Sequence, residues 1–134
     1  MKLTITIADD DRVLSQLLAA RLRRFGLEVV VAFDAMQSFM LAVRTVPSAI
    51  LLDINMPAGS GIDVLKRLKS SSKTSHIPVL VLSGSVDPAM SETVKQLGAE
   101  EFFTKPPNLD LLEATLRRML ALPALPAVPV LLAG

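Results

Sequence analysis

The 134-residue chain lacks cysteine and carries almost no net charge, and each lack excludes a class of function. Without cysteine it can form no disulfide, no thiolate zinc site and no thiol nucleophile. Its formal net charge is only +1, whereas proteins that bind nucleic acid usually show a strong basic excess. We therefore expect no direct nucleic-acid contact and no membrane contact. The absence of cysteine also suits a reducing cytoplasm, which is the location we expect.

Long apolar runs are lacking as well. The first apolar stretch, residues 3–8, contains threonines and is followed at once by three aspartates, which is typical of neither a signal peptide nor a membrane helix. Residues 122–134 are apolar but contain three prolines, which forbid a continuous helix, and they are too few to cross a bilayer. We expect one domain over residues 1–121. The tail over residues 122–134 is interpreted as an extended end, a linker or a strap on an apolar patch.

What is present is an alternation of two hydrophobic patterns. Short apolar or β-branched runs predict strands, and apolar residues at helical spacing between them predict five helices. The predicted strands are residues 3–8, 28–32, 49–52, 77–82 and 102–104. The predicted helix caps are Asp11, Asp34, Asp87 and Asn108. Because each crossover can hold a helix, the strands should be parallel, and the fold class is α/β with a doubly wound five-stranded sheet.

Several other residues have plain structural interpretations. Met36 and Met40 belong to the apolar face of the second predicted helix, and we interpret them as fillers of the core or of an interface. Arg21, at the end of the first helix, is interpreted as part of a solvated basic face. His76, the one histidine, lies in a polar loop, so we do not assign it a catalytic role.

Polar residues follow four of the five predicted strands at the point where each strand ends. Asp9 and Asp10 follow the first strand, Asp53 the third, Ser83 the fourth and Lys105 the fifth. Because the carboxyl ends of parallel strands meet at one edge of a sheet, these side chains should converge. Three carboxylates repel one another unless a cation is present, and Mg²⁺ prefers a few carboxylates together with waters and phosphate oxygens. A metal, a lysine and a hydroxyl around one carboxylate suit phosphoryl transfer through an aspartyl phosphate.

Four segments resemble the signature segments of response-regulator receiver domains in two-component signalling. They are residues 7–11 (Ile-Ala-Asp-Asp-Asp), 51–57 (Leu-Leu-Asp-Ile-Asn-Met-Pro), 81–84 (Val-Leu-Ser-Gly) and 103–106 (Phe-Thr-Lys-Pro). All four occur in order, each at a strand end, and the resemblance extends over residues 3–120. It implies the flavodoxin-like (βα)5 fold of the chemotaxis-regulator-like superfamily, with strand order 2-1-3-4-5.

The resemblance also implies roles for the residues around the central carboxylate. Asp53 matches the phosphoacceptor, and Lys105 matches the lysine that contacts the phosphoryl group. Ser83 matches the hydroxyl that moves to bond the phosphoryl group. Phe102 matches the switch position, an aromatic residue that rotates inward when the hydroxyl moves.

A metal site is implied in the same way. The carboxylates of Asp10 and Asp53 and the backbone carbonyl of Asn55 would bind Mg²⁺, with Mn²⁺ as an alternative. Asp9 would act mainly through metal-bound water.

The function that the resemblance implies is that of a phosphoacceptor. A histidine kinase or a histidine phosphotransfer protein would phosphorylate Asp53, and phosphorylation would switch the face formed by the fourth helix, fifth strand and fifth helix. That face would bind a downstream protein or form a homodimer. Since we expect no separate output domain within these residues, the chain could also be an intermediate in a phosphorelay or a part of a longer regulator. Apart from its own phosphorylation and dephosphorylation, we expect no enzymatic activity.

Two alternatives remain open. A metal-dependent phosphohydrolase would need an acid/base carboxylate two residues after the nucleophile, where this chain has Asn55. A pseudo-receiver that binds partners without phosphorylation would be expected to lose an acid or the lysine, and none is lost.

Overall fold

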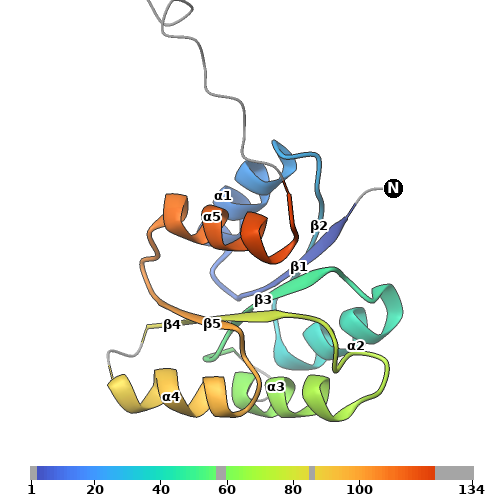
Figure 1. The fold of residues 1–134 in the computed structure, drawn as a ribbon, viewed down its shortest axis with the longest axis vertical. Helices are drawn as coiled ribbons and strands as arrows, with labels where there is room; N and C mark the ends of the chain where they lie inside the picture. The colour runs from blue at the N-terminus through green and yellow to red at the C-terminus, as the bar shows by residue number, and fades with distance from the viewer. Residues whose placement is uncertain (1–2, 57–59, 85–86, 123–134) are drawn as a thin grey trace, which may run out of the picture.

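The five strands form one parallel sheet in the order β2-β1-β3-β4-β5, which confirms the expected topology (Figure 1). The computed structural model describes residues 3–56, 60–84 and 87–122. The strands are β1 (Thr4–Ala8), β2 (Glu28–Ala32), β3 (Ala49–Asp53), β4 (Val79–Ser83) and β5 (Glu101–Thr104). Every residue of β3 and β4 is buried, because helices cover both faces of the sheet centre.

Helices lie on both faces of this sheet, as expected of a doubly wound fold (Figure 1). They are α1 (Arg12–Arg23), α2 (Ala35–Thr45), α3 (Gly61–Ser70), α4 (Pro88–Gln96) and α5 (Leu109–Met119). One layer of the core packs α1 and α5 against the sheet through leucines such as Leu18 and Leu112. The other layer packs α2, α3 and α4 through residues such as Ala42, Leu65 and Val94.

The four predicted caps are confirmed. The side chains of Asp11, Asp34, Asp87 and Asn108 each accept a hydrogen bond from a main-chain N–H in the first turn of their helix, at 2.7–3.1 Å. Each cap satisfies a donor that the helix itself leaves unpaired. The caps therefore fix where α1, α2, α4 and α5 begin, directly after the loops that leave the carboxyl ends of the strands.

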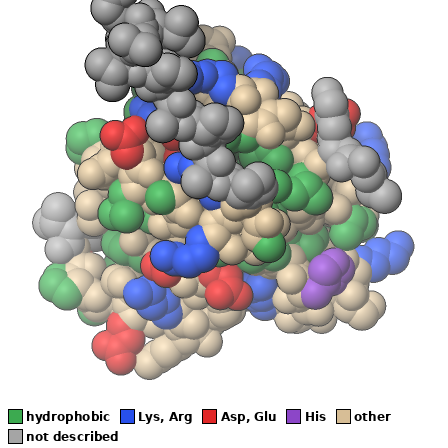
Figure 2. Space-filling view, turned by 45° about the horizontal axis from the view of Figure 1, so that its top comes forward, with side chains coloured by type: hydrophobic (Ala, Val, Ile, Leu, Met, Phe, Trp, Pro, Cys, Tyr) green, Lys and Arg blue, Asp and Glu red, His purple; other side chains and the backbone are tan. Residues whose placement is uncertain are grey.

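The fourth strand begins later than predicted. The apolar run starts at Ile77, but β4 starts at Val79. The main-chain N–H of Ile77 donates to the carbonyl of Thr74 at 3.0 Å, which holds residues 74–77 in a turn. His76, in the same turn, is exposed, and it is the one purple side chain in Figure 2. It lies outside the strand-end site, in agreement with its interpretation as a loop residue.

The orientation of the second helix decides between the two interpretations of its methionines, as fillers of the core or of an interface. It buries its small residues, Ala35, Ser38 and Ala42, against the sheet. Met36 and Met40 are 65% and 53% exposed. They are therefore not part of the core, and only the interface interpretation of these methionines stands.

Two further expectations concern the C-terminal tail and the membrane. Apart from Leu122, the tail lies outside the described residues, so the division at residue 121 stays a prediction. Among the helices of the described ranges, none is long and apolar enough to cross a membrane.

Candidate phosphoacceptor site

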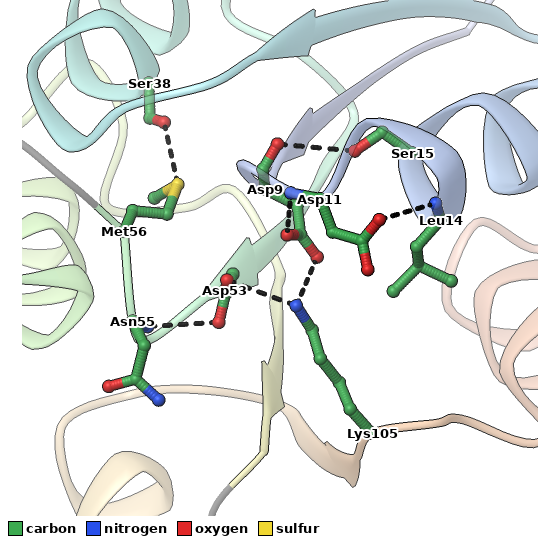
Figure 3. A network of polar contacts seen from close by, with 9 residues as sticks. All are labelled: Asp9, Asp11, Leu14, Ser15, Ser38, Asp53, Asn55, Met56 and Lys105. Carbon is green, nitrogen blue, oxygen red and sulfur yellow. Dashed lines mark hydrogen bonds and ion pairs between the residues drawn. The ribbon is translucent and has the colours of Figure 1, made fainter.

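The carboxyl ends of β1 and β3 lie side by side and place two aspartates together, as Figure 3 shows. Asp9 follows β1 directly and is fully buried, and Asp53 is the last residue of β3 and is 3% exposed. The main chain around Asp9 is held firmly. Its N–H donates to the carbonyl of Ala32 at 3.0 Å, and its carbonyl accepts from the Ser15 hydroxyl at 3.3 Å. The sequence prediction that these carboxylates meet is correct.

Lys105 reaches this pair from the end of β5 (Figure 3). Its Nζ lies 2.8 Å from Oδ2 of Asp9 and 3.2 Å from Oδ2 of Asp53. Its main-chain N–H donates to the carbonyl of Ser83 at 2.8 Å, which joins the ends of β4 and β5. The Lys105–Pro106 peptide bond is cis. One ammonium group is thus shared between two buried carboxylates.

The charges of Asp53 and Lys105 are unequally balanced. Burial raises the pKa of Asp53, and the nearby charge of Asp9 raises it further. The N–H of Asn55 and the ammonium of Lys105 lower the pKa without cancelling the rise. For Lys105, burial alone would lower the pKa, but the hydrogen bond to Asp9 and the charges of both aspartates outweigh burial and raise it. The site therefore stabilises the charged form of Lys105. For Asp53, the hydrogen bond and the ammonium do not fully offset the effect of burial on the charged carboxylate.

The acidic group also fits a divalent cation. One carboxylate oxygen from each of Asp9, Asp10 and Asp53 lies within 4.8 Å of the other two. Asp10 is exposed, so the group opens to solvent on one side. Mg²⁺ is bound by a few carboxylates together with water, and its ligands lie about 2.0–2.1 Å from the ion. The uncompensated charge of Asp53 is what such an ion would neutralise, so the residues present are compatible with Mg²⁺.

The segment after β3 is fixed by main-chain contacts. The N–H of Asn55 donates to Oδ1 of Asp53 at 3.0 Å, and the Asn55 side chain is exposed (Figure 3). The N–H of Gly61 donates to the carbonyl of Ile54 at 2.9 Å. A Cβ on Gly61 would lie 2.5 Å from the carbonyl oxygen of Asp53 and from the Cα of Ile54. Only glycine therefore lets α3 begin this close to Asp53.

Gly61 is a positioning residue that the sequence argument did not single out. A glycine at the first position of a helix, directly after a capping serine, was the available signal, because intrinsic propensity disfavours glycine inside helices. The sequence could not say which backbone the glycine approaches.

The two residues predicted to switch lie in different settings. Ser83 is fully buried at the end of β4, opposite Thr104 of β5. Phe102 is partly buried and packs against the core layer under α2, α3 and α4. It belongs to β5, an edge strand, next to the surface of α4. The switch roles of both residues stay predictions.

Comparison with known proteins gives a consistent result. The family model of the response regulator receiver domain matches residues 5–117. The chain is 33% identical over 121 residues to the DNA-binding dual master transcriptional regulator RpaA of Synechocystis, covering 87% of this chain and 48% of RpaA. It is 32% identical over 117 residues to the phosphate regulon transcriptional regulatory protein PhoB of Pseudomonas aeruginosa, covering 87% of this chain and 51% of PhoB. The chain thus spans about half the length of these relatives.

Solved structures agree in fold. A putative response regulator from Chloroflexus aurantiacus superposes with a TM-score of 0.84 at 26% identity, covering 90% of this chain and 99% of that one. The chemotaxis response regulator CheY4 of Vibrio cholerae gives a TM-score of 0.81 at 27% identity, covering 89% and 99%. A five-stranded α/β sandwich with an acidic pocket and a lysine at its strand ends defines the receiver class. The chain belongs to the response regulator receiver domain family.

Proposed function

We propose that this chain is a phosphoacceptor that takes a phosphoryl group onto Asp53, with Mg²⁺, from a histidine kinase or a histidine phosphotransfer protein. The observation that carries the proposal is the position of the Asp53 carboxylate. It is buried at the end of β3, 3.2 Å from Lys105 Nζ and grouped with Asp9 and Asp10. Receiver domains are phosphoacceptors with an acidic pocket that binds Mg²⁺, and this group matches that pocket.

The residues around Asp53 would divide the work. Asp10, Asp53 and the carbonyl of Asn55 would hold Mg²⁺, which would neutralise charge on the phosphoryl oxygens, and Asp9 would act through metal-bound water. Lys105 Nζ supplies the positive charge that the structure already places beside Asp53. The carboxylate attacks phosphorus, the bond from phosphorus to the donor breaks, and the donor keeps that electron pair.

The output would be a change on the face of α4, β5 and α5. A phosphoryl group adds a charge of roughly −1.5 to −2 and strong acceptor oxygens. Ser83 would move toward these oxygens and Phe102 would rotate inward, so that the population of the switched state increases. That face would then bind a downstream protein or a second copy of the chain. We expect these reactions in the cytoplasm and no catalysis beyond phosphorylation and dephosphorylation of Asp53.

The test is intact mass after incubation with acetyl phosphate, with and without Mg²⁺, on the parent and on Asp53→Asn. Asp63→Asn is the matched control, because Asp63 is an exposed carboxylate in the first turn of α3. We expect one phosphoryl adduct on the parent and on the control, only with Mg²⁺, and none on Asp53→Asn.

Two results would contradict the proposal. An adduct that persists in Asp53→Asn would place the phosphoryl group elsewhere. No adduct on the parent, under conditions where calorimetry shows Mg²⁺ binding, would favour the pseudo-receiver alternative.

A further inference from the structure

The outward face of α2 carries large apolar side chains that the described structure covers only in part. Phe39 packs against the core layer, and the Arg67 guanidinium lies over its ring at 5.5 Å from the centroid, whereas the methionines beside it are largely open. The four residues of this face recur at helical spacing: Met36, Phe39, Met40 and Val43. Met36 and Met40 are 65% and 53% exposed, and Phe39 and Val43 are partly exposed. Removing apolar side chains from water is favourable, so a partner that covers the methionines would gain what the fold leaves unused here. We call these four residues the α2 face.

Hollows flank this face on both sides. One groove of about 420 Å³ runs between α2 and α3, where Met36 and Phe39 face Val64. A second hollow of about 440 Å³ lies on the other side of the methionines, next to Leu41 and Arg44. The methionines thus form a ridge between two depressions. Methionine is flexible and polarizable, which suits a surface that repacks around a partner.

Acidic and basic side chains lie at opposite ends of the α2 face. The basic residues Arg44, Lys66 and Arg67 are exposed and lie in the later turns of α2 and α3. The acids that line the hollows, Asp34 and Asp63, stand at the beginnings of these helices. The Asp34 carboxylate is moreover engaged as the cap of α2. The later half of the face is therefore apolar with a basic border.

We propose that the α2 face is a docking surface for an amphipathic helix of a partner protein, with apolar anchors on one stripe and acidic residues beside them. An amphipathic helix packs its apolar stripe against a partner surface through anchors at i, i+3, i+4 and i+7, and here the anchors would enter the two hollows beside the methionines. The distance along the helix axis from Met36 to Val43 is about 10.5 Å, which matches that spacing. Acidic side chains of the partner would meet Arg44 on one side and Lys66 on the other.

The charge pattern argues against a second copy of this chain as the occupant. Two copies packed through the same face would bring two sets of Arg44, Lys66 and Arg67 toward one another, and like charges disfavour that contact. It also argues against the tail, residues 123–134, which offers the basic border no acidic side chain. The proposal does not depend on phosphorylation of Asp53, so it can stand or fall separately from the proposed function.

The probe is a synthetic helical peptide of about four turns with leucines on one stripe and glutamates on both flanks. One control peptide has lysines in place of the glutamates, and another has the same composition without a leucine stripe. Binding to the full unphosphorylated chain is measured by fluorescence anisotropy and mapped by amide and methyl NMR shifts. We expect a Kd on the order of 10 μM, since the contact is small.

Variants make the test specific to the α2 face. Met40→Glu should weaken binding at least tenfold, whereas Leu111→Glu should not, because Leu111 is equally exposed but lies on α5. The double variant Arg44→Glu, Lys66→Glu should reverse the preference, so that the lysine peptide binds better than the glutamate peptide. Arg23→Glu, Arg24→Glu at the end of α1 carries the same change in net charge and should not reverse the preference, so a reversal confined to the first variant requires contact between the peptide flanks and Arg44 and Lys66.

Four results would overturn the proposal. The first is equal binding of the peptide without a stripe, and the second is an unchanged Kd in Met40→Glu. The third is a dimer of the parent, by light scattering, that Met40→Glu abolishes, since a second copy would then occupy the face. The fourth is a change in the Met36 and Met40 methyl shifts when Leu131 and Leu132 of the tail are both replaced by serine.

Discussion

Replacing Gly61 by alanine tests whether α3 must begin in contact with the backbone of Asp53. A Cβ at this position would lie 2.5 Å from two main-chain atoms, the Asp53 oxygen and the Ile54 Cα, and 2.7 Å from the Ile54 oxygen. Ordinary contacts start near 3.4 Å, so the backbone segments must separate by close to an ångström. No flexible side chain can yield instead, because all three atoms belong to the main chain.

The expected cost follows from that geometry. Overpacking a well-packed site costs about 1–3 kcal/mol, and main-chain contacts belong at the upper end of that range. Gly61 has no positive φ, so the alanine would otherwise gain a few tenths of a kcal/mol to 1 kcal/mol from the unfolded state. We expect Gly61→Ala to lower the free energy of unfolding by about 2 kcal/mol and to slow phosphorylation from acetyl phosphate, because the Asp53 carbonyl must shift.

Urea unfolding followed by circular dichroism measures the first effect, and intact mass over time measures the second. Gly84→Ala is the matched control for stability. Its Cβ would meet no atom of the described residues within 4 Å and its φ is not positive, so the same chemical change should leave stability unchanged or slightly higher. A surface substitution usually changes the free energy of unfolding by no more than about 0.5 kcal/mol. If the values for Gly61→Ala and Gly84→Ala differ by less than that, the close approach does not constrain the site and the reasoning is wrong.

Three further predictions concern charge and hydrogen bonding. Because the pKa of Asp53 is raised in the fold, its ionisation costs stability above that pKa, and each unit of the rise is worth about 1.4 kcal/mol. Asp53→Asn should therefore be more stable than the parent at pH 7 in EDTA. The melting temperatures of the two proteins should converge as the pH falls below 3.8, the ordinary pKa of an aspartate. Lys105→Met should strengthen Mg²⁺ binding on the order of tenfold by calorimetry, since the ammonium competes for the same carboxylates, while slowing phosphorylation; weaker Mg²⁺ binding would contradict this account. Thr74→Val should cost about 1 kcal/mol in urea unfolding, because the buried Thr74 hydroxyl donates to the Leu68 carbonyl at 2.7 Å, whereas Thr74→Ser keeps that bond.

Much of the fold could be predicted because local signals and topology agreed. Capping side chains fixed four helix starts, and continuous short apolar runs such as residues 49–52 identified central strands. Topology alone then brought Asp9, Asp53 and Lys105 together, since parallel strands share their carboxyl edge. Sequence could not foresee that Lys105 lies nearer to Asp9 than to Asp53, because that depends on how one flexible side chain packs.

Other features depended on packing that periodicity does not encode. The periodicity of α2 does not tell which of its faces packs against the sheet. The face with the small residues Ala35, Ser38 and Ala42 does so, and Met36 is therefore exposed. Arg21 was expected in a solvated basic face. Instead its guanidinium pairs with Glu113 and Asp110 of α5, which ties α1 to α5. Pairings of residues about 90 positions apart follow from the layer order rather than from local sequence.

The uneven balance of charge at Asp53 would give the proposed switch a physical basis. Lys105 lies closer to Asp9, at 2.8 Å, than to Asp53, at 3.2 Å, so the more central carboxylate holds the smaller share of the ammonium. Phosphorylation at Asp53, as proposed, would place more negative charge where it is least compensated. The ammonium would then favour the phosphoryl oxygens over Asp9. The N–H of Lys105 is bonded to the Ser83 carbonyl, so the residue that would change its ionic partner stands at the junction of β4 and β5, beside the face of α4, β5 and α5.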